Sequence, residues 1–114
     1  MEKIDKKTQE KIQELQMIEQ TLQNVLYQSQ TFQIEFNEAK SALEEVKKTN
    51  KDVYRIVGNI MISSKKEDIE KELEEKKKVL SLRIKSFEKQ DKILREKTDS
   101  IREELEKSRD SLKN

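Results

Sequence analysis

One short segment, VYRIVGNIMI from Val53 to Ile62, constrains the fold more than any other part of the chain. It is rich in Val, Ile and Tyr, which favour strands, and it contains the only glycine, Gly58. The central pair Gly58-Asn59 is typical of a type II′ turn, whose twist suits the two strands of a hairpin. Long, highly charged sequences without proline flank the segment. We therefore predict a single β-hairpin between two long helices.

The sequence before the hairpin has the pattern of a coiled coil. No proline or glycine interrupts residues 3–48, and apolar residues recur at alternating steps of three and four, which form one seam along a helix. The seam positions are Leu15, Ile18, Leu22, Val25, Ser29, Phe32, Phe36, Ala39, Leu43 and Val46. A helix of this length, roughly 70 Å at 1.5 Å per residue, is too long for a compact domain of this size. We expect it to project as a rod.

The sequence after the hairpin repeats this pattern. Its seam positions are Leu73, Lys77, Leu80, Ile84, Phe87, Asp91, Leu94, Thr98, Ile101, Leu105, Ser108 and Leu112. Before them, the S-x-x-E pattern predicts a capping box with Ser64 as N-cap and Glu67 at N3. The chain is thus predicted to be one mainly α domain over residues 1–114. It comprises an antiparallel two-helix coiled coil, residues 1–48 and 65–113, with a hairpin at residues 53–64.

Folding the chain back at the hairpin brings the two seams into register. The expected layers pair Leu43 with Leu73, Phe36 with Leu80, Phe32 with Ile84, Leu22 with Leu94, and Leu15 with Ile101. Asp91 is the poorest seam residue, and we place it at a solvated edge. Beyond the layer of Leu15 and Ile101, polar residues occupy seam positions, so we expect the helix pair to fray or splay apart towards both termini. Fraying would expose Ile4, Ile12, Leu105 and Leu112 at the free end, or tip, of the helix pair.

The apolar residues of the hairpin lack a partner surface within the chain, because the helices use their own apolar residues in the seams. A two-residue loop places Val57 opposite Ile60 and Ile56 opposite Met61, so apolar side chains lie on both faces. An isolated hairpin is only marginally stable, and both of its edges are open to further strands. The hairpin could fold back on its own helices, but their apolar residues are used in the seams. We expect other chains to supply the missing strands, which predicts an obligate oligomer.

Composition excludes several classes of function. The chain has no His and no Cys, so we expect no thiol nucleophile, no metal site, no cofactor and no enzyme activity. Its net charge is only +1, which disfavours nucleic acid and membrane surfaces as partners. No apolar run approaches a membrane span, and MEKIDKKTQE lacks a signal-peptide core, so we expect a cytoplasmic protein. Two classes remain: an oligomeric binding module, or a homo-oligomeric structural coiled-coil scaffold.

Glutamine enrichment marks the first helix between Gln13 and Gln33. This surface is either a neutral, solvated helix face or a polar surface that holds partners.

The order helix, hairpin, helix around VYRIVGNIMI resembles the β-type subunit of prefoldin, above all its archaeal form. The most specific matching parts are Val53-Tyr54-Arg55, Gly58-Asn59-Ile60-Met61-Ile62, and Leu80-Ser81-Leu82-Arg83 leading to Glu88-Lys89-Gln90. The α-type subunit has two hairpins, and this chain has residues for only one.

The resemblance implies an ATP-independent cochaperone, a hexamer of two α-type and four β-type subunits whose hairpins form a β-barrel. Its coiled-coil tips hold unfolded polypeptide and deliver it to a group II chaperonin. On this basis the expected assembly residues are Val53, Tyr54, Ile56, Val57, Gly58, Ile60, Met61 and Ile62. The expected client contacts are Ile4, Ile12, Leu105 and Leu112, and the expected chaperonin contacts are Lys107, Arg109 and Lys113.

Overall fold

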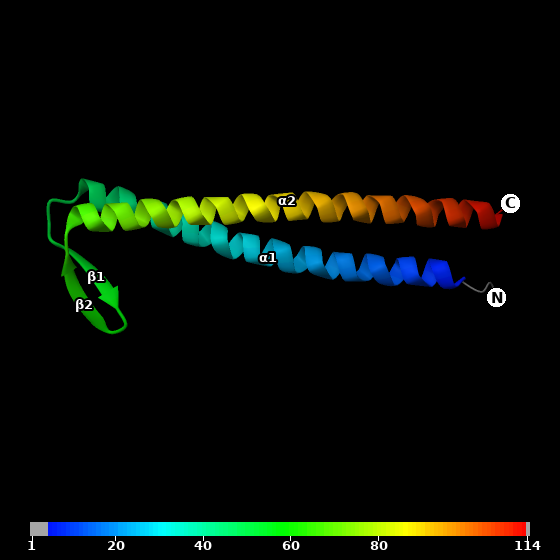
Figure 1. Cartoon of the computed structure of the whole chain (residues 1–114), viewed down its shortest axis with the longest axis horizontal. Coiled ribbons are helices and arrows are strands. Elements are labelled where there is room, and N and C mark those ends of the chain that lie inside the picture. Colours follow the sequence, from blue (N-terminus) through cyan, green and yellow to red (C-terminus); the bar gives the residue numbers. More distant parts are fainter. Residues whose placement is uncertain (1–4, 114) are drawn as a thin grey trace. The chain divides into compact units, whose positions relative to one another are not determined.

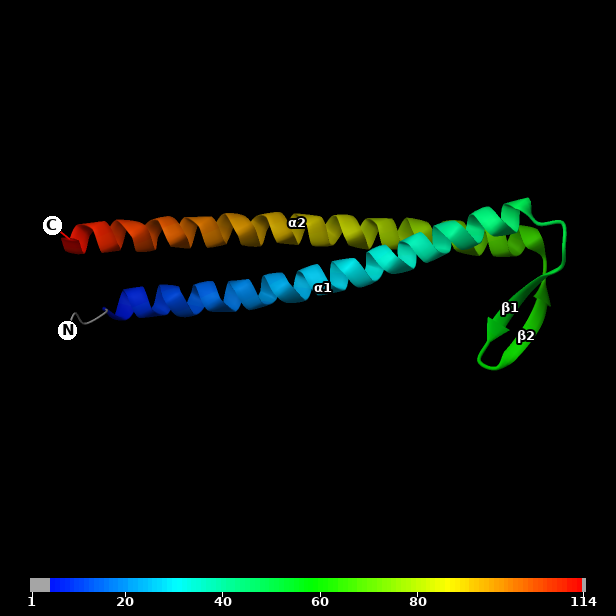
Figure 2. The ribbon, with the colours of Figure 1, turned by 180° about the vertical axis from the view of Figure 1, so that it is seen from behind.

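A computed structural model describes residues 5–113 of the chain, and the side chains of residues 5–110. Figure 1 shows two helices joined through one hairpin, as predicted. The elements are α1 (Lys6–Lys48), β1 (Val53–Val57), β2 (Ile60–Ser64) and α2 (Lys66–Lys113). They form two compact units. The hairpin unit comprises residues 29–85, and the terminal unit comprises residues 1–28 and 86–114. Within each unit, α1 and α2 run in opposite directions (Figures 1 and 2).

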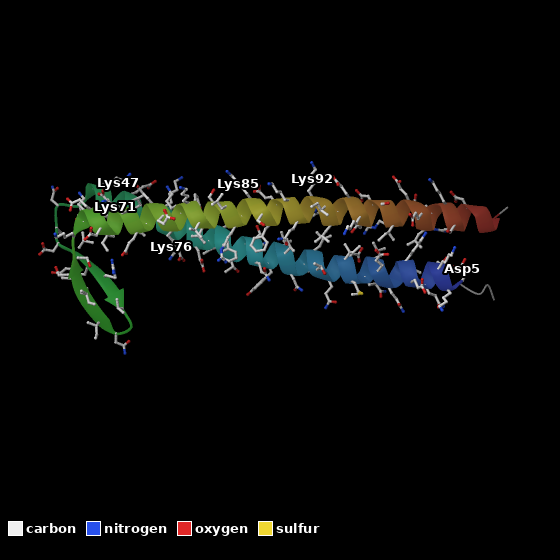
Figure 3. All side chains as sticks on the ribbon, viewed as in Figure 1. Asp5, Lys47, Lys71, Lys76, Lys85 and Lys92 are labelled. Carbon is white, nitrogen blue, oxygen red and sulfur yellow. The ribbon has the colours of Figure 1, made fainter. Side chains whose placement is uncertain are left out.

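Asp5 sets the start of α1, a role that the sequence analysis did not assign. The Thr8 backbone amide donates a hydrogen bond to Asp5 Oδ1 at 2.7 Å, and the Gln9 amide donates to the Asp5 carbonyl at 3.1 Å. Asp5 is therefore the N-cap of the helix (Figure 3). The hydrogen bond from the Thr8 backbone amide, aided by the Thr8 hydroxyl, lowers the pKa of the Asp5 carboxyl.

The predicted capping box at the start of α2 was wrong. Ser64 is the last residue of β2, where it pairs with Val53, and its hydroxyl donates to the Ile62 carbonyl at 3.2 Å. α2 begins at Lys66, one residue later than an N-cap at Ser64 requires. The Lys65 carbonyl accepts the first amide hydrogen bonds of the helix, at 3.1 Å. Ser64 is therefore held in the strand by its pairing with Val53 and does not cap the helix.

Burial confirms the predicted seam in both units. In the hairpin unit, Ala39, Leu43 and Leu80 are buried, and Phe32, Phe36, Leu73 and Ile84 are half-buried. In the terminal unit, Ile18, Val25 and Ile101 are buried, and Leu15, Leu22 and Leu94 are half-buried. Lys92, off the seam, extends away from α1 (Figure 3). Ile69 is buried as well, although the predicted seam began at Leu73. Extending the predicted seam from Leu73 by four residues towards the N-terminus reaches Ile69.

Asp91, the poorest residue of the predicted seam, is accounted for by an ion pair within α2. Arg95 Nε donates to both carboxylate oxygens of Asp91, at 2.9 and 3.1 Å. The two residues are four apart, so they are neighbours on one face of the helix. Asp91 is half-buried. It therefore lies at the seam edge, as expected, with its charge paired.

Polar contacts between α1 and α2 lie beside the predicted layers. In the terminal unit, Lys11 pairs with Glu104 at 2.6 Å, and Glu19 pairs with Arg102 at 2.9 Å, on either side of the layer expected at Leu15. In the hairpin unit, the Lys77 ammonium lies 5.8 Å from the centroid of the Phe36 ring, and the Arg83 guanidinium lies 5.3 Å from that of Phe32. These contacts agree with the register proposed from the sequence.

Cysteine pairs provide a direct test of this register. The chain has no native cysteine, so Leu22→Cys with Leu94→Cys, and Phe32→Cys with Ile84→Cys, should each form one intrachain disulfide on mild oxidation. The product would migrate faster on a non-reducing gel. Leu15→Cys with Leu94→Cys is the control, because a displacement of one heptad, about 10 Å along the helix, is too great for a disulfide. Failure of both expected pairs to cross-link would contradict the register.

Thr98 is a polar residue inside the seam. Its side chain is 5% exposed, and Oγ1 has no hydrogen-bond partner among the described residues. A buried, unsatisfied hydroxyl costs about 1–3 kcal/mol. Thr98→Val keeps the shape of the side chain and replaces the hydroxyl by a methyl group. We expect this substitution to raise the free energy of unfolding by about 1 kcal/mol in a denaturant titration.

Thr21→Val is the matched control for this prediction. Thr21 is exposed, and its hydroxyl donates to the Met17 carbonyl at 2.9 Å, so its replacement removes a satisfied group and should not stabilise the protein. Equal stability of Thr98→Val and the unsubstituted protein would show that the Thr98 hydroxyl carries no penalty.

Candidate oligomerisation and binding surfaces

The hairpin has the predicted register and turn. Val57 pairs with Ile60 and Ile56 pairs with Met61, and the ladder continues to Val53 opposite Ser64. Gly58 has φ of 60°, and no described residue other than glycine has positive φ. Only the first central residue of the loop is therefore left-handed, as a type II′ turn requires.

Six apolar side chains of the hairpin are exposed in this chain. Their exposed fractions range from 47% to 69%, and the residues are Tyr54, Ile56, Val57, Ile60, Met61 and Ile62. Because side chains alternate between faces along a strand, these residues occupy both faces of the hairpin. The alternative in which the hairpin buries itself against its own helices is wrong for these six residues. Such a concentration of exposed apolar side chains is typical of an interaction surface.

Both strands of the hairpin also have an unpaired edge. Among the described residues, the sheet contains only β1 and β2, so each strand has one edge whose backbone groups can pair with another strand. Isolated two-stranded sheets are marginally stable in water. The surface made by the six apolar side chains and the two free edges is called the hairpin surface below.

Polar contacts near the base of the hairpin do not cover this surface. The Arg55 guanidinium pairs with the Glu72 carboxylate of α2. Lys66 Nζ donates to the carbonyls of Lys47 and Thr49, both at 3.1 Å, and so caps the end of α1 with a positive charge. In both views of the ribbon, the hairpin projects sideways from the helices of its unit (Figures 1 and 2). The Arg55–Glu72 pair thus links the hairpin to α2, the Lys66 contacts join the start of α2 to the end of α1, and the six apolar side chains of the hairpin stay exposed.

Two of the predicted tip residues, Ile12 and Leu105, lie on intact helix. α1 is helical from Lys6 and α2 to Lys113, so neither helix unwinds within the described residues, and separation of two intact helices towards the tip stays a prediction. Ile12 and Leu105 are half-buried, and the Lys11–Glu104 ion pair spans the two helices beside them. Of the other predicted contacts, Lys107 and Arg109 are exposed on α2, Ile4 lies outside the described residues, and Leu112 and Lys113 lie outside the described side chains.

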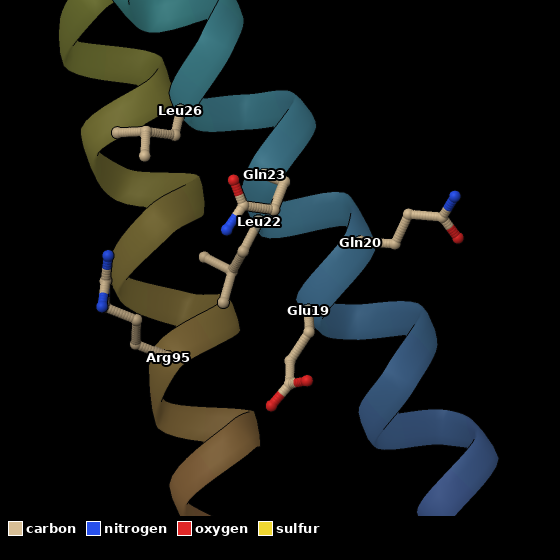
Figure 4. Close-up of a pocket in the computed structure, with 6 residues that line it drawn as sticks. All are labelled: Glu19, Gln20, Leu22, Gln23, Leu26 and Arg95. Atoms are coloured by element: carbon tan, nitrogen blue, oxygen red, sulfur yellow. The ribbon is translucent and has the colours of Figure 1, made fainter.

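A shallow groove in the terminal unit was not foreseen from the sequence. It is lined by Glu19, Gln20, Leu22, Gln23, Leu26 and Arg95. In Figure 4, Leu22, Gln23 and Leu26 point towards α2, whereas Gln20 points away from it. Leu26 is 43% exposed although it is a large apolar residue. An apolar residue next to the seam, within the glutamine-rich stretch, was the available signal in the sequence.

Two other kinds of feature are absent from the described residues. None of their His, Cys, Asp and Glu side chains form a group of three or more that could hold a metal ion. Within the same part of the chain, neither helix has a stretch long and apolar enough to cross a membrane.

Comparison with known proteins confirms the resemblance noted in the sequence. A family model described as "Prefoldin subunit" matches residues 9–110. The prefoldin subunit beta of Archaeoglobus fulgidus is 35% identical over 108 residues, which cover 93% of each chain. That of Saccharolobus islandicus is 32% identical over 106 residues, covering 91% of this chain and 84% of the relative.

A solved structure agrees with this assignment. The crystal structure of the prefoldin beta subunit from Thermococcus strain KS-1 superimposes with a TM-score of 0.87 at 32% identity, covering 95% of this chain and 96% of that one. The hairpin motif, the two-helix fold and these matches lead to one assignment: the chain belongs to the prefoldin family.

Proposed function

We propose that this chain is a β-type prefoldin subunit that acts as an ATP-independent cochaperone in the cytoplasm. It binds unfolded polypeptide at its coiled-coil tips and transfers it to a group II chaperonin. Family membership supports a chaperone role, not catalysis, and assembly with other prefoldin subunits. The further details of partner, client and transfer are the proposal.

The hairpin surface is the observation that carries the proposal. Its apolar side chains cover both faces, and both of its edges are free, so it is complete only when strands from other chains surround it. A β-barrel built from several hairpins would pair every edge and bury the inner face. We propose that this chain enters such a barrel in a hexamer of two α-type and four β-type subunits, through Val53 to Ile62.

Client binding is assigned to the tips for a different reason. Binding without nucleotide has to draw on burial of apolar surface, and Ile12 and Leu105 are apolar residues near the free ends of the two helices. Each tip contributes little, and several tips in one assembly give avidity. Ile4 and Leu112 extend the same proposal to the termini, and Lys107, Arg109 and Lys113 are the proposed chaperonin contacts.

An aggregation assay tests the proposal against the alternative of a purely structural scaffold. A chemically denatured test protein is diluted into buffer with this chain, with an α-type partner, or with both. We expect the mixture of both to suppress light scattering without ATP. If the chain forms a stable oligomer with the partner and the test protein still aggregates at its unassisted rate, the scaffold explanation replaces the cochaperone proposal.

A further inference from the structure

The two faces of the hairpin differ in their relation to α2. Directly opposite residues of an antiparallel ladder share a face, and successive pairs alternate between the faces. The face called the helix-side face below carries three pairs, which are Val53 with Ser64, Arg55 with Ile62, and Val57 with Ile60. The face called the open face carries the other two pairs, which are Tyr54 with Ser63, and Ile56 with Met61. Both faces have large apolar side chains, so other properties have to distinguish them.

Two observations place α2 next to the helix-side face. The Arg55 guanidinium of that face pairs with the Glu72 carboxylate of α2. At the base of the hairpin, the helix-side pair of Val53 and Ser64 is half-buried. The adjacent pair of the open face, Tyr54 with Ser63, is exposed. The helix-side face is thus partly covered at its base, whereas every residue of the open face is exposed.

Charge distinguishes the two faces as well. Arg55 is the only charged residue between Val53 and Ser64, and it belongs to the helix-side face. The interior of a closed barrel excludes water, and a charged group is strongly disfavoured there unless it is fully paired. The open face has two large apolar side chains, Ile56 and Met61, and two hydroxyl groups, which lie in the pair nearer the helices. It can therefore be enclosed without burying a charge.

The position of α2 favours the same face. Side chains of a barrel strand alternate between interior and exterior, and strands from other chains would complete the wall around the interior. The pair of Arg55 with Glu72 brings α2 within side-chain reach of the helix-side face, so a wall closing on that side would meet the helix of the same chain. Within the described residues, no side chain covers the open face. A barrel can close on that side without displacing α2.

We propose that the open face lines the interior of the intersubunit barrel, where it packs against uncharged faces of hairpins from other prefoldin subunits. Ile56 and Met61 are then the contribution of this chain to the barrel core. Arg55 is a positioning residue, because its pair with Glu72 keeps the charged face towards α2 and outside the barrel. This inference rests on the proposed function and adds to it which face of the hairpin is buried.

Two isoleucines provide a matched test of the face assignment. Ile56 on the open face and Ile60 on the helix-side face are 69% and 65% exposed, and they belong to neighbouring pairs of the ladder. Lysine at position 56 would bring an ammonium group into the barrel, whereas at position 60 its long side chain can carry the charge to water. Light scattering over a dilution series with the α-type partner measures the concentration at half-assembly. We expect Ile56→Lys to raise it at least about 100-fold and Ile60→Lys less than about tenfold.

A second pair of variants repeats the comparison with the strands exchanged. Met61 is an open-face residue of β2, and Val57 is a helix-side residue of β1. Met61→Lys should therefore act like Ile56→Lys, and Val57→Lys like Ile60→Lys, which excludes an effect of one strand or of closeness to the turn. Circular dichroism of each variant verifies that both helices still form.

A charge exchange tests the positioning role of Arg55. Arg55→Glu sets two carboxylates side by side and should raise the concentration at half-assembly about fivefold, the scale of one exposed ion pair. Adding Glu72→Arg to Arg55→Glu restores opposite charges and should restore assembly. If the exchanged pair assembles no better than Arg55→Glu alone, Arg55 does not position the hairpin through Glu72.

The outcomes separate the face assignment from the proposed function. If Ile60→Lys and Val57→Lys weaken assembly as much as Ile56→Lys and Met61→Lys, or more, the open face is not the barrel interior, although assembly through the hairpin stands. If Ile56→Asp together with Ile60→Asp leaves the particle unchanged, assembly through the hairpin itself fails, and the face assignment fails with it.

Discussion

Replacing both Ile56 and Ile60 by aspartate is expected to reduce the assembled protein to monomers or small species. The two side chains are 69% and 65% exposed in the single chain and belong to neighbouring pairs of the ladder, on opposite faces of the hairpin. Full burial of an isoleucine contributes about 1.5–3 kcal/mol, and an unpaired carboxylate in its place adds a desolvation cost of several kcal/mol. Multi-angle light scattering after size exclusion would measure the change.

Ile34→Asp is the control for this prediction. Ile34 is 59% exposed on α1, within the same unit, and lies off both the seam and the hairpin. It places one carboxylate at a comparably exposed isoleucine, where the hairpin variant has two, and assembly should persist because the position lies outside the hairpin surface. Circular dichroism should show equal helix content in all variants, because none of the three positions supports a helix seam. A hexamer-sized particle from the chain that carries both Ile56→Asp and Ile60→Asp would refute the assembly role of the hairpin surface.

The elements that the sequence predicted well are those specified by local pattern. The hairpin register follows from a two-residue loop, and the left-handed Gly58 follows from the glycine at its first position. The seam follows from the alternating three- and four-residue steps, and every predicted position with a described side chain is buried or half-buried. Both kinds of pattern depend on residues close in sequence, so one sequence suffices to find them.

The errors arose where two structures compete for the same residue, or where partners are distant in sequence. The predicted cap at Ser64 ignored the ladder partner Val53, which holds Ser64 in a strand. The groove at Leu26 depends on Arg95, which lies in the other helix, and on the way the two helices pack. The unpaired hydroxyl of Thr98 is likewise a property of packing, because most helical threonines can donate to a carbonyl one turn earlier.

Truncation of the coiled-coil tips is expected to have the second large effect, a loss of client protection. Removing residues 1–12 and 105–114 should abolish suppression of client aggregation and leave the assembly intact. The truncation removes Ile12 and Leu105, together with the Lys11–Glu104 ion pair, and retains the hairpin surface and the seam from Leu15 to Ile101. Since the proposed grip consists of several weak contacts used at once, loss of a contact from every tip lowers the overall affinity by the product of the individual losses. The scattering assay with a denatured protein measures the effect, and size exclusion verifies the assembly.

Two double substitutions in the full-length chain show whether the truncation acts by removing apolar contacts with the client or by shortening the helices. Ile12→Gln with Leu105→Gln removes the apolar groups and keeps every residue of α1 and α2, so it should reproduce most of the loss. Met17→Gln with Ile93→Gln makes the same chemical change at two exposed apolar residues of the terminal unit and should leave protection unchanged. Full protection by the truncated assembly would place client binding outside the tips, because the residues proposed to make the contact would be gone.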